Sequence, residues 1–374
     1  MPTVSLLMET FESVSASHGI DSVFAQVEDM TISGNEDYDV IIFIRPNDIL
    51  SFSLARAAKA QGIAVITYCD DDLLNRGIDV PWRRRGLLGT INSSDCVCSP
   101  NPLLCKKYEK LTIQKSSFVL PTTVDSSGFM YHEENAQPIR ILYAANSSHV
   151  AYFDALIGPI LPNLIKEFGN SISLTFIGVH PALGSYANDI DVTYVPSLSF
   201  DEYRHYVSSN VFDIGLAPLP DTKFHRYKYF NKYIEYTLAG IFGIYSNVAP
   251  YTFAVRNLET GLLAENTEAG WLNALRLAIS DCDMRKQGVL AAQAHLSKLY
   301  SLDVVINQFA DDVSKVCART RAVGVSPHVG LKKMQYRMLK PLERPWLFMG
   351  LLLHGEWETM VNKIAAKLRF HLSA

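Results

Sequence analysis

The sequence lacks the motifs of the most common nucleotide-binding and hydrolytic sites. It contains no G-x-G turn, which a nicotinamide- or flavin-binding strand–turn–helix unit needs, and no Walker A loop. An H-E-x-x-H zinc-binding helix and a G-x-S-x-G nucleophile elbow are missing as well. These absences argue against a two-domain dehydrogenase and against the common hydrolases.

The chain also lacks a strong excess of charge and a long apolar run. Its 34 basic and 38 acidic residues leave a formal net charge of −4, whereas a general nucleic-acid-binding domain is strongly basic. The first nine residues have neither the basic start nor the apolar run of a signal peptide. No stretch reaches the roughly 18 apolar residues that span a bilayer. We therefore expect a cytoplasmic protein with no nucleic-acid partner.

Cysteine is scarce, with six residues in a chain of 374, whereas disulfide frameworks belong to short secreted domains. Only Cys96 and Cys98 lie close together, and no second pair follows at zinc-binding spacing. We interpret both as small buried side chains, and we predict no metal site.

What the sequence does have is a regular alternation of short β-rich runs and amphipathic segments. In the first third, the predicted strands are residues 4–7, 40–44, 64–68 and 96–98, and the predicted helices are residues 14–27, 50–61 and 103–111. Several of these strands are apolar on both faces, which is typical of a parallel sheet covered by helices on both sides. The pattern predicts a doubly wound α/β domain.

A polar, turn-rich segment over residues 118–138 interrupts this alternation, which then starts again. The later predicted strands are residues 140–144, 172–178, 192–195, 213–217 and 241–245, and the later predicted helices are residues 150–168, 271–279 and 285–300. At roughly 150 residues per domain, we expect two α/β domains and an appendage. The expected boundaries are 1–125, a linker at 126–138, 139–322 and a tail at 323–374. A cleft between two such domains is a usual place for a small-molecule site.

The tail differs in composition from the rest of the chain. Residues 331–374 contain eight basic and three acidic side chains, and residues 346–357 are apolar between Trp346 and Trp357. This stretch is too short to span a membrane, but it is basic and aromatic enough to lie on one. The alternative is a helix that packs back across both domains.

The most informative run covers residues 213–246, where a strand is followed by a loop and then by a helix expected to start near Tyr229. Lys228, Lys232 and Glu235 stand at positions i, i+4 and i+7, so they would share one face of that helix. Two cations near a helix N-terminus suit a diphosphate, and a carboxylate further along can accept hydrogen bonds from ribose hydroxyls. The alternative is a solvated ladder of ion pairs.

This run resembles the donor-binding half of the GT-B glycosyltransferases, closest to the family 4-like branch of bacterial surface-polysaccharide assembly. The positions that fit the pattern are Phe224, Lys228, Lys232, Glu235, Tyr236 and Gly240. Residues 143–154 are similar to the first strand–helix turn of the donor domain, and residues 120–125 are similar to the connection before it. Residues 43–46 and 67–74 resemble the arginine and paired-aspartate features of the branch.

The resemblance implies a GT-B fold, with two Rossmann-like domains facing a cleft: an acceptor domain (1–125), a donor domain (139–322) and a helical C-terminal appendage. It implies retaining, metal-independent transfer of a sugar from a UDP-, GDP- or dTDP-linked donor to a glycan or lipid-linked acceptor, with no further cofactor. Peripheral contact with a membrane would come from the 331–374 tail.

The same resemblance assigns roles to individual residues. Lys228, Lys232 and His149 would act on the departing diphosphate, where cations stabilise charge that develops in the transition state. The residues implied to bind the nucleotide-sugar are Glu235, Asn146, Ser147, Ser148 and Tyr236. From the residues alone, the 146–148 turn is equally compatible with ordinary helix capping, and His149 with a structural role.

One position departs from the family pattern. Many retaining members carry two glutamates eight positions apart; Glu235 matches the second, and the first falls at Tyr227. This departure leaves open a catalytically inactive relative that binds a glycan or another protein.

In the first domain, four residues are expected on the acceptor side of the cleft: Arg45, Asp70, Asp71 and Asp72. Arg45 has a surface position as its alternative. Asp70 and Asp72 also form a D-x-D pattern, which in metal-dependent transferases holds a divalent cation against the diphosphate. A metal-dependent transferase is therefore the competing enzyme hypothesis.

Overall fold

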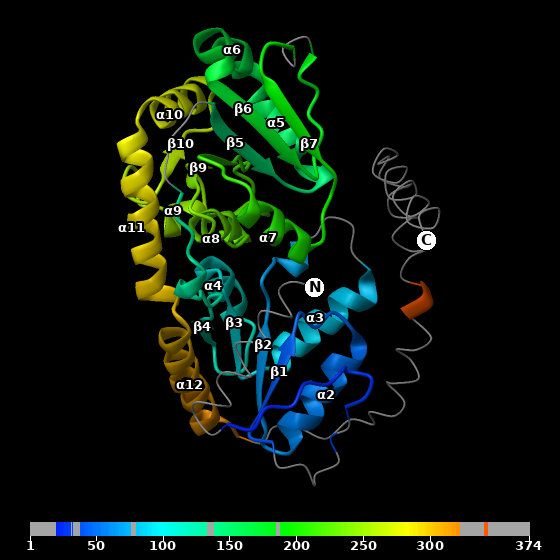
Figure 1. Ribbon diagram of the computed structural model, residues 1–374. Helices are drawn as coiled ribbons and strands as arrows, with labels where there is room; N and C mark the ends of the chain where they lie inside the picture. Colours follow the sequence, from blue (N-terminus) through cyan, green and yellow to red (C-terminus); the bar gives the residue numbers. More distant parts are fainter. Residues whose placement is uncertain are drawn as a thin grey trace. The chain divides into compact units, whose positions relative to one another are not determined.

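The computed structural model describes residues 20–30, 32, 38–75, 80–132, 138–184, 188–321 and 340–342 (Figure 1). The described chain divides into two compact units. Residues 121–308 belong to the first, which we call the six-stranded unit. Residues 20–120 and 309–321 belong to the second, the four-stranded unit. The division falls at Leu120 on the way out of the four-stranded unit and at Phe309 on the way back.

The described residues of the four-stranded unit form a parallel sheet in the order β1-β2-β3-β4. Its strands are β1 (Val40–Ile44), β2 (Ala64–Tyr68), β3 (Cys96–Ser99) and β4 (Ser116–Val119). Its helices are α2 (Ile49–Ala60), α3 (Pro81–Ser93) and α4 (Pro102–Glu109). Every residue of β2 and β3 is buried, Cys96 and Cys98 included. A strand that faces helices on both sides is mostly apolar along its length, which is why the sequence predicts these two strands well.

Two of the earliest predicted elements have a different outcome. The predicted strand 4–7 and residues 14–19 of the predicted helix 14–27 lie outside the described residues. The described remainder of that segment, residues 20–27, contains no helix, so the helix prediction is wrong there.

The described residues of the six-stranded unit form a second parallel sheet, in the order β10-β9-β8-β5-β6-β7 (Figure 1). Its strands are β5 (Ile139–Ala144), β6 (Ile172–Ile177), β7 (Asp191–Val195), β8 (Ile214–Ala217), β9 (Phe242–Ser246) and β10 (Leu262–Ala264). The chain runs outward from β5 through β6 to β7, then returns to the other side of β5 and runs outward again from β8. This is the Rossmann strand order, with its reversal between β5 and β8.

Helices cover both faces of this sheet. They are α5 (Val150–Leu156), α6 (Leu161–Phe168), α7 (Phe200–Ser209), α8 (Asn231–Leu238), α9 (Tyr251–Ala254), α10 (Glu268–Ser280) and α11 (Cys282–Tyr300). Alternate residues of β5 enter two separate cores, because side chains on a strand alternate between faces. Ile141 and Tyr143 pack with α5, α6 and α10, whereas Leu142 and Ala144 pack with α7, α8 and α9.

The single helix predicted over residues 150–168 is wrong. The structure has α5, then a 3₁₀ turn at Gly158–Ile160, and then α6. Pro159 lies in that turn, and a proline has no backbone N–H and clashes with the preceding turn of an α-helix.

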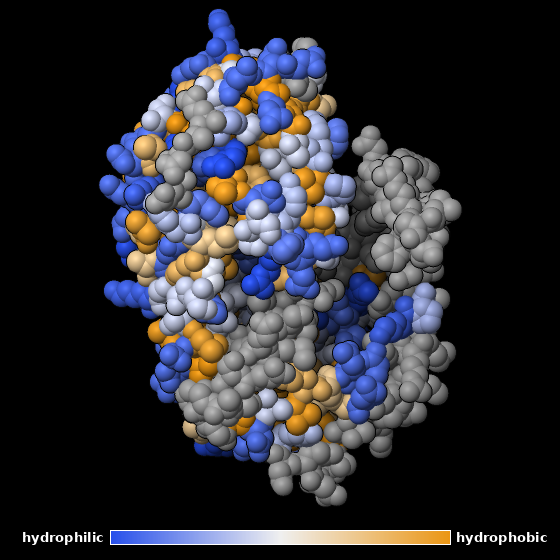
Figure 2. All heavy atoms as spheres, in the orientation of Figure 1, coloured by the Kyte–Doolittle hydropathy of each residue, from blue (hydrophilic) through white to orange (hydrophobic). Residues whose placement is uncertain are grey.

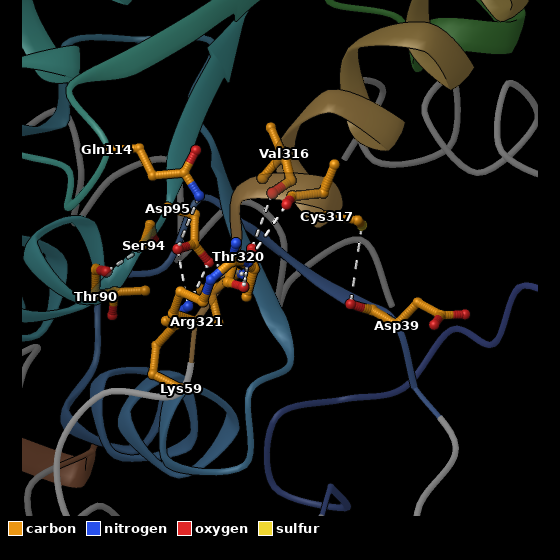
Figure 3. Close-up of polar contacts among 12 residues, drawn as sticks. Asp39, Lys59, Thr90, Ser94, Asp95, Gln114, Val316, Cys317, Thr320 and Arg321 are labelled. Atoms are coloured by element: carbon orange, nitrogen blue, oxygen red, sulfur yellow. Dashed lines mark hydrogen bonds and ion pairs between the residues drawn. The ribbon is translucent and has the colours of Figure 1, made fainter.

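The chain returns to the four-stranded unit through α12 (Leu302–Arg319). This helix was not predicted from the sequence pattern. The ring of Phe309 meets the ring of Phe118 on β4 edge-on, with 6.2 Å between centroids. Figure 3 shows the end of α12, where the Cys317 thiol approaches the carbonyl oxygen of Asp39 just before β1. This helix lies within the range predicted for the second domain (139–322), ahead of the predicted appendage at residues 323–374.

The predicted tail, residues 323–374, lies outside the described residues except for 340–342, where Lys340 forms an ion pair with Glu28. Its contact with a membrane stays a prediction. Among the described residues, none of the helices combines the length and apolarity that a membrane-spanning segment requires. On the face drawn in Figure 2, hydrophilic and hydrophobic residues are intermixed over the described surface.

Candidate functional site

The site residues predicted in the second half of the chain gather where the strand order of the six-stranded sheet reverses. The turn of Asn146, Ser147 and His149 follows β5, and the loop over residues 218–230 follows β8. β5 and β8 are adjacent and parallel, so both segments leave the sheet at its carboxyl-terminal edge. In open α/β sheets, ligands bind at this edge, at the point where the strand order reverses.

After β5, the chain makes a 3₁₀ turn at Ser147–His149 and passes directly into α5. The Tyr143 hydroxyl, on β5, donates a hydrogen bond to the carbonyl oxygen of His149 at 2.9 Å and so fixes the turn to the strand. Asn146 and Ser147 are exposed; the Ser148 side chain lies outside the described residues. The proposed role of this turn in binding a phosphate stays a prediction.

After β8, a loop leads into a 3₁₀ turn at His225–Tyr227 and then into α8. α8 begins at Asn231, so Lys228 lies before the helix, in extended backbone. The prediction that Lys228, Lys232 and Glu235 share one helical face is therefore wrong for Lys228. The Lys228 ammonium instead lies 5.5 Å from the centroid of the Phe224 ring.

Lys232 and Glu235, one turn apart on α8, form an ion pair with 2.6 Å between Nζ and the carboxylate oxygen. Both side chains keep about a quarter of their surface exposed (25% and 26%), so neither extends freely into solvent. The opposite side of α8 faces the core: Ile234 is buried, as is Phe230, the residue directly before the helix.

Tyr203, on α7, completes this group and was not found from the sequence. Its hydroxyl donates to the Glu235 carboxylate at 3.1 Å and accepts from the Lys232 ammonium at 3.3 Å. The Lys232 ammonium also lies over two aromatic rings, 4.8 Å from the centroid of Tyr203 and 5.7 Å from that of Tyr236. Burial lowers the pKa of Lys232, but the Glu235 carboxylate and the nearby tyrosines outweigh it, so the pKa lies above its usual value. Lys232 is therefore charged at neutral pH.

Tyr236 is placed differently from its predicted role in binding the nucleotide-sugar. Its side chain is fully buried, and its hydroxyl donates to the carbonyl oxygen of Leu216 on β8 at 2.8 Å. A Cβ atom at Gly215, on the same strand, would lie 2.6 Å from the Tyr236 ring, so the strand needs glycine there. Tyr236 thus supports Lys232 from within the core and has no surface that a ligand can contact. This part of the site prediction is corrected.

His149 lies close to the cations of the β8 loop and α8. Burial lowers its pKa to about 4, and the charges of Lys228 and Lys232, together with His225, act in the same direction. Its ring packs against that of Tyr152, with 4.6 Å between centroids. The imidazole is thus neutral at pH 7, when one ring nitrogen can donate and the other can accept a hydrogen bond.

The acidic residues predicted in the first half of the chain follow β2 in the four-stranded unit. Arg45, directly after β1, forms ion pairs with Asp70 at 3.0 Å and with Asp71 at 3.2 Å. Its backbone has φ of +50°, a left-handed conformation that is uncommon for a residue with a Cβ atom. Arg45 is therefore tied to these carboxylates at the carboxyl-terminal edge of its sheet and is not a loose surface side chain.

Asp72 has a separate set of partners. Its carboxylate is buried and bonds Lys107, the Tyr108 hydroxyl at 2.9 Å and the Asn75 amide at 2.8 Å. Asp70 and Asp72 thus bind different cations. Among the described residues, no group of three or more His, Cys, Asp and Glu side chains is arranged to hold a metal ion.

Comparison with known proteins adds evidence on the fold alone. No protein-family model and no curated protein sequence matches the chain. Solved structures do match. HepE of Anabaena, in complex with UDP and glucose, is 12% identical with a TM-score of 0.53, covering 82% of this chain and 81% of its own. Sucrose-phosphate synthase of Thermosynechococcus elongatus is 14% identical with a TM-score of 0.54, covering 83% and 77%.

A trehalose-phosphate synthase of Burkholderia xenovorans is 12% identical with a TM-score of 0.52 and covers 74% of each chain. Like the other two structures, it has the two Rossmann-like domains of the GT-B fold.

Proposed function

The chain has the GT-B fold, and we propose that it is a glycosyltransferase that moves a sugar from a nucleotide-sugar to a hydroxyl acceptor. The observation that carries this proposal is the gathering of Lys228, Lys232, Glu235 and His149 where the strand order of the six-stranded sheet reverses. In a Rossmann-like sheet this is the place for a nucleotide. A pair of lysines suits its diphosphate, and a carboxylate suits its ribose.

The two lysines would do the main chemical work. Transfer breaks the bond between the anomeric carbon and a diphosphate oxygen, forms a bond to the acceptor oxygen and releases the acceptor's proton. Negative charge grows on the departing diphosphate, and fixed cations beside it lower the barrier because they are already in place. Neutral His149 can add a hydrogen bond without repelling Lys228 or Lys232.

Glu235 would exchange partners when the nucleotide binds. Its carboxylate accepts hydrogen bonds from Lys232 and Tyr203. When the nucleotide binds, the ribose hydroxyls would donate to this carboxylate in place of Lys232, and the Lys232 ammonium would bind the diphosphate. The pairing of Lys232 with Glu235 keeps both groups satisfied until then, which offsets the cost of half-burying two charges.

The finer features of the proposal follow the resemblance seen in the sequence. They are retention of configuration, independence of a metal, and an acceptor that is a growing surface glycan. Arg45, Asp70 and Asp71 are proposed to contact this acceptor. The pairing of Asp72 with Lys107 and Tyr108 supports metal independence over the D-x-D alternative, because that carboxylate is already occupied. Unchanged activity in excess EDTA is the expected result, and strict dependence on manganese would reverse this choice.

A second candidate function rests on Tyr227, which stands where many retaining members have their first glutamate. It is a GT-B protein that binds nucleotide or glycan but does not transfer. Nucleotide binding without donor hydrolysis or transfer, over a broad panel of donors and acceptors, would favour this alternative.

The first prediction tests the nucleotide site. We expect isothermal titration to detect binding of UDP, GDP or dTDP. UDP is the first choice, because HepE was solved with UDP. Glu235→Ala should weaken nucleotide binding by about 1–3 kcal/mol, because ribose hydroxyls lose their acceptor. Binding of inorganic pyrophosphate should not weaken, since it has no ribose and Lys232 is released.

The matched control for this prediction is Glu259→Ala. Glu259 forms an exposed ion pair with Arg256 at the same i, i+3 spacing, and both side chains are 57% exposed. Its substitution should change neither binding constant. An unchanged nucleotide affinity in Glu235→Ala contradicts the assignment of Glu235.

A further inference from the structure

A chain of three polar side chains crosses the reversal point beside the candidate site. The Thr222 hydroxyl lies 2.7 Å from Nδ1 of His225, and the Tyr152 hydroxyl lies 2.8 Å from Nε2 of the same ring. His225 is buried. Both of its ring nitrogens therefore have a hydroxyl partner, and the imidazole is held at each end.

The chain connects the two segments that carry the candidate site. Thr222 and His225 belong to the loop after β8, and His225 lies three residues before Lys228. Tyr152 belongs to the first turn of α5, three residues after His149. The hydrogen bonds among these three side chains therefore help to fix the β5 turn against the β8 loop, in addition to the pairing of β5 with β8 in the sheet.

Tyr152 packs between two histidines that lie near Lys228. Its ring packs on His149 at 4.6 Å and meets the edge of His225 at 5.2 Å, with an interplanar angle of 88°. The charge of Lys228 lowers the pKa of both histidines, and burial contributes first in each case. The Tyr152 side chain therefore contacts two neutral imidazoles, and Lys228 is close enough to act on both of them.

His225 has two neutral tautomers, and the hydroxyls of Thr222 and Tyr152 can satisfy either one. In one of them, the Thr222 oxygen accepts from the backbone N–H of His225 at 3.3 Å and the Thr222 hydrogen is donated to Nδ1. A neutral imidazole that accepts at Nδ1 carries its proton at Nε2, and this N–H donates to the Tyr152 oxygen. The Tyr152 hydroxyl then keeps its own hydrogen for another acceptor.

We propose that Tyr152 is a further ligand of the donor's diphosphate, with its hydroxyl hydrogen oriented by His225 and, through it, by Thr222. The proposal rests on the proposed function, because it places the diphosphate beside Lys228. Tyr152 supplies an uncharged donor where a third cation would repel two lysines, while His225 and Thr222 are positioning residues.

The test measures binding of inorganic pyrophosphate to the full chain by isothermal titration. Tyr152→Phe removes only the hydroxyl and keeps the ring on His149. It should weaken pyrophosphate binding roughly tenfold, because a hydrogen bond to a charged group is lost. Thr222→Val should weaken pyrophosphate binding by only about two- to threefold, since the Tyr152 hydroxyl remains and only its orientation is less restricted. Adding Thr222→Val to Tyr152→Phe should cause no further loss, because the two residues act through one chain.

The chain offers a matched control in Tyr233→Phe. The Tyr233 hydroxyl also bonds a histidine, Nδ1 of His295 at 2.9 Å, but the partner lies on α11. This variant loses the same kind of hydrogen bond and should keep the pyrophosphate affinity of the intact chain. Thermal unfolding of each variant identifies any that no longer fold.

The possible results separate this proposal from the proposed function. An intact chain that binds neither pyrophosphate nor any of the three nucleotides contradicts the proposed function itself. If the intact chain binds and Tyr152→Phe binds equally well, the proposed function stands and the role of Tyr152 is overturned. Equal tenfold losses from Tyr152→Phe and Thr222→Val would also overturn it, because the hydroxyl would then act only through the loop.

Discussion

Two imidazoles at the candidate site stay uncharged under ordinary conditions. The pKa of His149 and the pKa of His225 are each lowered to about 4 by burial and then by the nearby charge of Lys228. A neutral imidazole can take part in hydrogen bonds of either sense, whereas an imidazolium would add to the charge of the lysines. At neutral pH the site therefore has two cations and two neutral rings.

The second prediction follows from these pKa values. In the unfolded chain a histidine has a pKa near 6.5, so between about pH 6.5 and pH 4 the unfolded chain binds protons that the folded chain does not. The free energy of unfolding must then fall as the pH is lowered through this range. Urea titrations at pH 7 and pH 5 measure the difference. His225→Asn, which cannot titrate, should lose less stability between the two pH values; an equal loss argues against a depressed pKa at His225.

The third prediction separates two neighbouring aspartates. Asp72 is buried and bonded to Lys107, Tyr108 and Asn75, so Asp72→Asn should destabilise the protein by about 1–3 kcal/mol. Asp71 is 29% exposed and pairs with Arg45 at 3.2 Å. Asp71→Asn should therefore cost less than about 1 kcal/mol. Denaturant titration of both variants checks this contrast, and equal losses would contradict the structural role assigned to Asp72.

At the residue scale, the sequence predicts those parts of the candidate site that depend on spacing along one element. Lys232 and Glu235 are one turn apart, and their pairing follows from helix geometry. Tyr203 could not be found in this way, because it reaches Glu235 from another helix, 32 positions away in the chain. Lys228 was misplaced because α8 begins at Asn231, two residues later than predicted, which leaves Lys228 in extended backbone before the helix.

Among the elements, strands were easier to predict than helices that pack through small residues. β1 and β2 have the predicted bounds, since buried parallel strands are short apolar runs. The sequence pattern did not predict α3, because its N-terminal half contains Arg83, Arg84 and Arg85 and its apolar positions have little helical periodicity. A Cβ atom at Gly86 would lie 2.3 Å from backbone atoms of Asp48. Gly86 therefore allows α3 to pack closely against the backbone of Asp48. A pattern of apolar residues in the sequence does not reveal a contact of this kind.

The fourth prediction concerns α12. Phe309 is buried and packs edge-on against Phe118 of β4, so Phe309→Ala should destabilise the four-stranded unit by about 3–5 kcal/mol through the lost ring and the cavity left behind. Hydrogen exchange should rise in peptides from β3 and β4. Val304→Ala, on the same helix at a position that is 46% exposed, is the control and should change little. Unchanged exchange in Phe309→Ala contradicts a stabilising role for α12.

At the scale of the whole molecule, charge is distributed unevenly along the chain. The 331–374 tail carries a net charge of +5, which leaves −9 for residues 1–330. A basic segment is attracted to an anionic lipid surface by about 1 kcal/mol for each lysine or arginine near it, and we expect the apolar stretch between Trp346 and Trp357 to add burial at such an interface. A transferase that extends a lipid-linked glycan would gain from this attraction, because its acceptor lies at the membrane.

The fifth prediction is that the intact chain floats with vesicles that contain anionic lipid and that a chain ending at Pro327 does not. Removing the tail leaves α12 and its contacts with the four-stranded unit in place, so the shortened chain should keep its fold and its pyrophosphate affinity. Raising the salt concentration should release the intact chain, since the Debye length shortens to about 3 Å at 1 M and screens the charges. Equal flotation of the two chains would mean that the tail is not the membrane-binding segment. We would then expect its basic residues to contact the acidic remainder of the chain.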